Sequence, residues 1–104
     1  MIIAIATDRA DSNQYISENF GRSQWFYLYN TGTKDAWFVK NTAALEEQNA
    51  GINTVDFLLG LNINMVISLR FGTKTTIKLR EENIQIVIPL AKKRLIDIVK
   101  QLAE

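Results

Sequence analysis

The sequence predicts one α/β domain over residues 1–104, with a three-layer arrangement around a five-stranded mixed sheet of order 3-2-1-4-5 in which strand 2 is antiparallel to the rest. Three observations predict it. A short apolar run that opens the chain suits a strand buried on both faces and central in its sheet. Two aromatic-rich segments separated by a short turn form a hairpin. Two strand–helix units follow, and right-handed crossovers place their strands on the other side of the sheet.

The first half of the chain supplies the three predicted strands of the antiparallel part. In the strand over 2–7, Ile alternates with Ala before the run stops at Thr-Asp. The segments 25–29 and 36–39 are rich in aromatic residues, and residues 30–34 between them have hairpin-turn length and composition. Residues 41–49 are polar, with a helical turn predicted within 43–48.

The second half alternates between helix and strand and brings the number of helices to about three. Apolar residues recur at helical spacing from Ile52 to Leu59, Gly60 lies where that helix should end, and Pro89 ends the last strand. A stripe of apolar residues from Leu95 to Leu102 marks the last helix. The predicted elements are a helix over 50–60, a strand over 63–69, a helix over 74–82, a strand over 84–88 and a helix over 91–103.

Composition excludes several classes of function. The chain is 47% apolar with a net charge of +1, so no strong field directs it to nucleic acid or to a membrane. It has no cysteine and no histidine, which excludes disulfides, thiolate metal sites and Ser-His-Asp or Cys-His catalysis. No apolar run reaches the roughly 18–20 residues of a membrane span, and no signal peptide is recognisable at the start. We therefore expect a cytoplasmic protein with no membrane or nucleic-acid partner.

Four motifs carry a resemblance to a known family. They are Ile3-Ala4-Ile5-Ala6-Thr7-Asp8, Ser17-Glu18-Asn19-Phe20-Gly21-Arg22, Ala50-Gly51-Ile52 at the start of a helix, and Phe71-Gly72 between a strand and a helix. In order and spacing the chain resembles the dinitrogenase iron–molybdenum cofactor biosynthesis family, the NifX/NifB-type domain. The resemblance implies a ribonuclease-H-like fold without nuclease activity and a role in binding or carrying an iron–sulfur or iron–molybdenum cluster.

The chain departs from that family at two positions. The family commonly has histidine where Asn19 stands, and a second histidine where Gln48-Asn49 precede the helix. An amide is a poor ligand for iron or molybdenum because it lacks the charge and basicity of a thiolate or an imidazole. The cofactor therefore stays unknown: the family implies a metallocluster, while the His and Cys ligands are absent here.

The candidate site lies where strands 1 and 4 end, because parallel neighbours place their following loops at the same sheet edge. Arg22, Arg70 and the helix start after Gly72 can form an anion site there without any metal ligand. The alternative is that Arg22 pairs with Glu18 or Asp8 on the surface. Gly21 either adopts a positive φ, permits a close approach of the chain, or forms a plain tight turn. The candidate cofactor-binding residues are Thr7, Asp8, Asn19, Gly21, Arg22, Asn49, Gly51, Arg70, Gly72 and Thr73.

The predicted function is a non-enzymatic cofactor-binding or carrier protein whose partner is a metallocluster or a small anion. The alternative is a protein-interaction or regulatory module that contacts a partner protein and binds no cluster. A nuclease needs several converging carboxylates, and the sequence places no further carboxylate with Asp8 at the end of its strand. We expect Asp8 instead to cap the following loop by accepting hydrogen bonds from backbone N–H groups.

Overall fold

The computed structural model describes residues 1–104 and places five strands in one sheet. The strands are β1 (Ile2–Thr7), β2 (Trp25–Asn30), β3 (Ala36–Lys40), β4 (Met65–Ile67) and β5 (Gln85–Val87). Their order is β3-β2-β1-β4-β5. The pairs β1–β2 and β2–β3 are antiparallel, and the pairs β1–β4 and β4–β5 are parallel. The predicted strand order and strand directions are confirmed.

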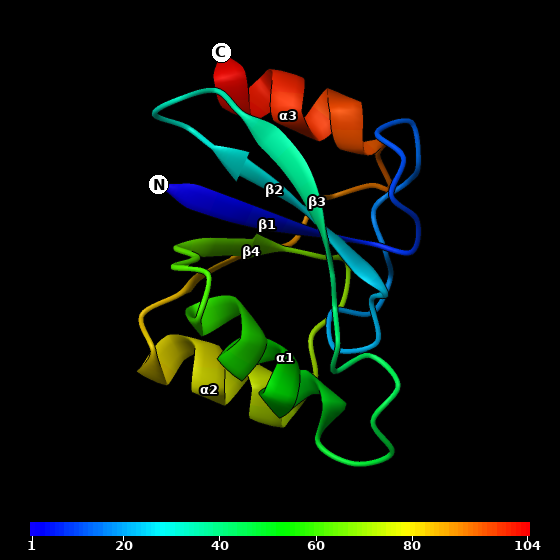
Figure 1. The fold of residues 1–104 in the computed structure, drawn as a ribbon, viewed down its shortest axis with the longest axis vertical. Coiled ribbons are helices and arrows are strands. Elements are labelled where there is room, and N and C mark those ends of the chain that lie inside the picture. The colour runs from blue at the N-terminus through cyan, green and yellow to red at the C-terminus, as the bar shows by residue number, and fades with distance from the viewer.

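Three helices complete the three layers (Figure 1). The helices α1 (Ala50–Leu59) and α2 (Thr73–Glu81) lie side by side on one face of the sheet, and α3 (Leu95–Ala103) covers the other face. Each parallel connection passes through one helix of the first pair, as a right-handed crossover requires. Both of these helices therefore begin near the edge of the sheet where β1 and β4 end.

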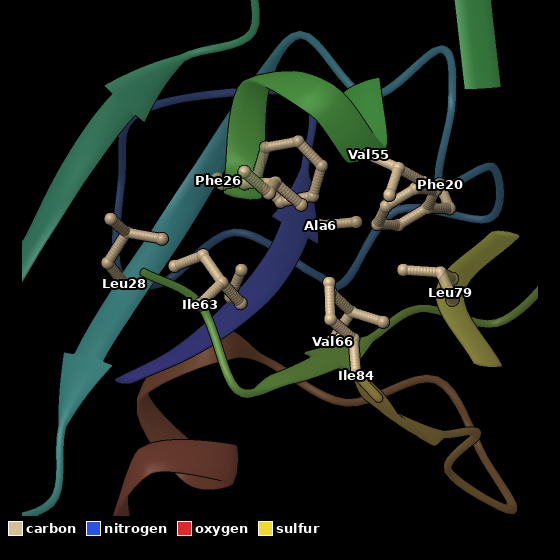
Figure 2. Close-up of a cluster of buried hydrophobic side chains, with 11 residues drawn as sticks. Ala6, Phe20, Phe26, Leu28, Val55, Ile63, Val66, Leu79 and Ile84 are labelled. Carbon is tan, nitrogen blue, oxygen red and sulfur yellow. The ribbon is translucent and has the colours of Figure 1, made fainter. Parts of the chain in front are cut away.

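The alternation of Ile and Ala in β1 divides the core into two clusters. Ala4 and Ala6 face α1 and α2, whereas Ile3 and Ile5 face α3, and none of the four is more than 1% exposed. The small alanines leave space on their side of the sheet for larger side chains from β2, β4, α1, α2 and the loop after β1 (Figure 2). Burying each large apolar side chain contributes about 1.5–3 kcal/mol, so this cluster is a main source of stability.

The last helix begins later than the sequence predicts. Residues 91–94 are not helical, and Arg94 is extended with φ −74° and ψ 148°. The reason is a competing set of hydrogen bonds: Ile16 N–H donates to Lys93 O at 2.9 Å, and Leu95 N–H donates to Gln14 O at 2.9 Å. The segment before α3 is thereby held against the loop that follows β1, and the helix starts only at Leu95.

The predicted strands over 63–69 and 84–88 are longer than the observed β4 and β5. Ile63 and Ile84 precede these strands, yet both are buried in the cluster beneath α1 and α2. Both residues are apolar because their side chains are buried where the chain enters the sheet, although neither belongs to a strand. Residues 42–45 form turns in place of the helical turn predicted within 43–48.

Candidate functional site

Phe20 anchors the loop that follows β1. Its side chain is 1% exposed, and its ring centroid lies 5.5 Å from that of Phe26 in β2 and 5.1 Å from that of Phe71 after β4. Such tilted aromatic contacts contribute about 0.5–1.5 kcal/mol beyond area burial. The aromatic cluster therefore fixes the β1 loop and the β4 loop to the same part of the core.

Backbone hydrogen bonds join the same two loops directly. Phe20 N–H donates to Arg70 O at 3.2 Å, and Leu69 N–H donates to Ser17 O at 3.3 Å. The Ser68 hydroxyl also donates to Ser17 O, at 3.2 Å. The loops leave the sheet side by side, as expected for parallel neighbours, and Arg70 comes to lie beside the loop that carries Arg22.

Glycines bring the start of α1 against these loops. A Cβ atom at Gly21 would lie 2.6 Å from the Gly51 Cα atom, and a Cβ atom at Gly51 would overlap the Thr75 hydroxyl of α2. The positive φ considered for Gly21 is wrong, because no glycine in the chain has a positive φ. Gly21 is needed for close approach, since a side chain there would meet the backbone of α1.

A cavity of about 490 Å³ opens where the three segments meet, and we call it the edge pocket. Seven of the ten candidate residues line it: Asn19, Gly21, Arg22, Asn49, Gly51, Arg70 and Gly72. The other lining residues are Phe20, Ala50, Ile52, Phe71, Lys74 and Thr75.

The edge pocket is cationic. Arg22, Arg70 and Lys74 line it, and no aspartate or glutamate does. Neither α1 nor α2 has an acidic residue in its first turn or a side-chain cap. No hydrogen bond in the structure uses the first-turn N–H groups of residues 50–52 or 73–75. Free N–H groups at a helix N-terminus carry partial positive charge, so both helices add to the field of the three cations.

Arg22 does not form the surface ion pair considered as its alternative role. Its guanidinium donates to the backbone oxygen of Ala44 at 3.2 Å, to that of Glu46, and to that of Glu47 at 3.4 Å. The ion pair of this structure joins Lys78 to Asp56 instead, at 2.7 Å. Arg22 thus braces the turns between β3 and α1 while its side chain lines the edge pocket.

The remaining three candidate residues lie outside the edge pocket. Thr7 is fully buried and its hydroxyl donates to Tyr15 O at 3.2 Å, so it holds the loop in place. The expected capping role of Asp8 is wrong: its carboxylate accepts from the Ser17 hydroxyl at 3.3 Å, and no backbone N–H donates to it. Asp8 lines a neighbouring cavity of about 340 Å³. Thr73 begins α2 on the exposed side.

Sequence reasoning missed the aromatic wall and the helix contact of the edge pocket. Phe20 and Phe71 line it, and Thr75 packs against Gly51. A signal for the first two was present, because each phenylalanine directly precedes a glycine of a site loop, giving two Phe-Gly pairs in the chain. Thr75 had no such signal, since its role depends on how two helices meet.

The residues of the edge pocket fit an anion and do not fit direct coordination of a metal ion. No group of three or more His, Cys, Asp or Glu side chains converges anywhere in the structure. Guanidinium, ammonium and N–H groups are hydrogen-bond donors that complement phosphate, oxyanions or carboxylates. A metal-containing cargo would therefore be held through the anionic groups at its own surface.

Fold and pocket together define a small α/β domain with a cationic cavity at the carboxyl edge of its parallel strands. The chain belongs to the family described as dinitrogenase iron-molybdenum cofactor, whose sequence profile matches residues 1–104. The family predicted from the sequence motifs is confirmed. No curated protein matches the chain.

Solved structures share this fold. The apo form of the orange protein from Desulfovibrio gigas superposes with a TM-score of 0.88 at 21% identity, over 96% of this chain and 84% of that one. A NifB-like protein from Thermotoga superposes with a TM-score of 0.82 at 18% identity, over 98% of this chain and 86% of that one. At these identities the similarity establishes the fold alone. None of the three helices is long and apolar enough to cross a membrane.

Proposed function

We propose that this protein is a non-enzymatic carrier that binds an anionic metal cluster, or a small anion related to one, in the edge pocket. Membership of the iron–molybdenum cofactor family supports the class of cargo. The observation that carries the proposal is the donor set of the pocket: Arg22, Arg70 and Lys74 beside two helix starts, with no acid among the lining residues.

The chemistry of these donors favours recognition of the outer surface of the cargo. Charge-assisted hydrogen bonds from Arg to an anion are roughly twice as strong as neutral ones, and helix N-termini bind anions with their free N–H groups. Phe20, Ile52 and Phe71 supply an apolar part of the wall. Because no protein side chain bonds to a metal in this scheme, release of the cargo breaks no metal–protein bond, which suits a carrier.

Anion titration followed by amide NMR tests the pocket. Molybdate, sulfate and phosphate are added separately, and we expect shifts confined to residues 19–22, 49–52 and 70–75. Arg70→Gln should weaken binding by about tenfold or more, because a hydrogen bond to a charged group contributes about 1.5–3 kcal/mol. Arg80→Gln is the matched control, since Arg80 lies on α2 outside the edge pocket. Uniform or absent shifts at millimolar anion would refute the proposal.

A second experiment tests the cargo itself. The protein is incubated anaerobically with extracted iron–molybdenum cofactor, desalted, and analysed for iron and molybdenum. We expect both metals to remain with the wild-type chain and to be reduced in Arg70→Gln, with Arg80→Gln unchanged. Anion shifts at the pocket without retention of cofactor would restrict the function to binding small anions.

A further inference from the structure

The strand β5 forms one edge of the sheet, and part of its backbone faces outward. Gln85 N–H donates to Asn64 O at 3.0 Å, and Val87 O accepts from Ser68 N–H at 3.4 Å. Gln85 and Val87 therefore face β4. Because alternate residues of a strand turn their backbone groups to opposite sides, those of Ile86 face away from the sheet, and Ile88, which follows the strand, makes no backbone hydrogen bond. Four hydrogen-bonding groups are thus available along this edge.

Apolar grooves flank the edge on both faces of the sheet. On the α2 side, Ile84, Ile86, Ile88 and Phe71 line a groove of about 540 Å³. On the α3 side a smaller groove of about 210 Å³ has a mostly apolar lining that includes Leu90. Ile88 is 57% exposed and the side chain of Leu90 is fully exposed. A strand added to this edge would pair with the open backbone groups and cover the apolar surface on both faces of the sheet.

The charged residues that line the two grooves are of one sign. Arg80 lines the groove on the α2 side and Lys93 lines the groove on the α3 side, and no aspartate or glutamate lines either. Arg80 has no ion pair, and the Lys93 ammonium donates only to the neutral Gln101 amide, at 3.0 Å. Each groove therefore offers a cation without an acidic partner.

We propose that β5 is the docking edge for an extended segment of a partner protein, which pairs with Ile86 and Ile88 as a sixth strand. Apolar side chains of that segment alternate between the two grooves, and acidic residues at its ends lie against Arg80 and Lys93. Backbone pairing supplies affinity, while the grooves and the two cations supply specificity.

A second copy of this chain is a poorer occupant. Two β5 edges placed together would bring four cations and no acid to the same grooves, and like charges in an interface oppose association.

The test uses a synthetic octapeptide, acetylated and amidated, with Val and Ile in its four central positions and two Glu at each end. A second peptide has Lys in place of every Glu. We expect amide shifts confined to residues 84–90 with the Glu peptide, and binding about tenfold weaker with the Lys peptide, because two ion pairs become two repulsions. Shifts that are absent or spread over the surface at millimolar Glu peptide would overturn the proposal.

Matched variants locate the binding edge. Ile88→Lys should abolish the shifts, whereas Ile77→Lys should leave them unchanged, because Ile77 is similarly exposed at 52% but lines neither groove. Arg80→Glu should remove the preference between the two peptides, because one groove then carries an acid while Lys93 remains in the other. Sedimentation of the chain alone identifies the rival occupant: a dimer that Ile88→Lys dissociates would show that a second copy covers this edge and would overturn the partner proposal.

Discussion

Gly21 and Gly51 lie backbone against backbone, so that a Cβ atom added to Gly21 would come within 2.6 Å of the Gly51 Cα atom. The contact joins the loop after β1 to the first turn of α1. It leaves no room for a side chain, although both residues have ordinary negative φ angles. Space, not backbone conformation, sets the requirement for glycine here.

Gly21→Ala should destabilise the protein by about 1–3 kcal/mol, because overpacking at a rigid backbone contact forces local shifts. Thermal denaturation measures the effect as a lower Tm. Gly72→Ala is the matched control, since a Cβ atom there would meet nothing closer than Thr75 Oγ1 at 3.8 Å. Equal melting temperatures for the two variants would contradict the packing explanation.

Gly51→Ala and Thr75→Ala should be energetically coupled. A methyl group on Gly51 would overlap the Thr75 hydroxyl oxygen but would lie 3.4 Å from the Thr75 Cβ atom, which is ordinary contact. Thr75→Ala should therefore relieve much of the cost of Gly51→Ala. Urea denaturation of both single variants and the double variant should give a coupling energy of about 0.5–3 kcal/mol. Strict additivity would show that α1 and α2 adjust independently.

Arg22→Lys should loosen the turns between β3 and α1. The guanidinium contacts three backbone oxygens there, and an ammonium cannot reproduce that planar fork. Loss of about 0.5–1.5 kcal/mol of hydrogen bonding should speed amide exchange of residues 44–47 by about threefold to tenfold. Arg70→Lys serves as the control, because the Arg70 side chain makes no hydrogen bond in the structure. Equal exchange in both variants would exclude the bracing role.

Simple iron should not remain bound to this chain. After anaerobic incubation with iron and sulfide and then desalting, we expect no stoichiometric iron and no charge-transfer band, because the chain offers no thiolate or imidazole ligand. Asn19 lines both the edge pocket and the neighbouring cavity that contains Asp8. Asn19→His places an imidazole there and should raise iron retention. Tight iron binding by the wild-type chain would contradict the proposal that the cargo is held through the anionic groups at its own surface.

The strand order was predictable because it depends on patterns that lie within short segments. The continuous apolar run of β1 indicated a central strand, and the aromatic hairpin fixed the direction of β2 and β3. Parallel pairing of β1 with β4 requires their loops to meet, which is why the sequence alone predicts Arg22 and Arg70 at the same edge of the sheet. Most of the edge pocket follows from this one topological relationship.

The errors concern contacts between segments that are distant in sequence. Residues 91–94 have reasonable helix propensity, but the loop at residues 14–16 offers them backbone hydrogen bonds instead. The alternative of an ion pair between Arg22 and Glu18 or Asp8 relied on acids that are close in sequence, yet the chain returns 22 residues later with Ala44 O in reach. The tertiary structure determines which of the competing contacts forms, and no local pattern in a single sequence indicates the outcome.

The edge pocket is assembled from three junctions that are far apart along the chain, at residues 19–22, 49–52 and 70–75. Its cations come from the first and third junctions, so a nascent chain that has not yet completed β4 and α2 lacks Arg70 and Lys74 at the pocket. The proposed anion binding therefore depends on completed folding. A ligand that binds only the native state shifts the unfolding equilibrium by mass action, and for this protein molybdate protection against urea or protease would report that all three junctions have come together.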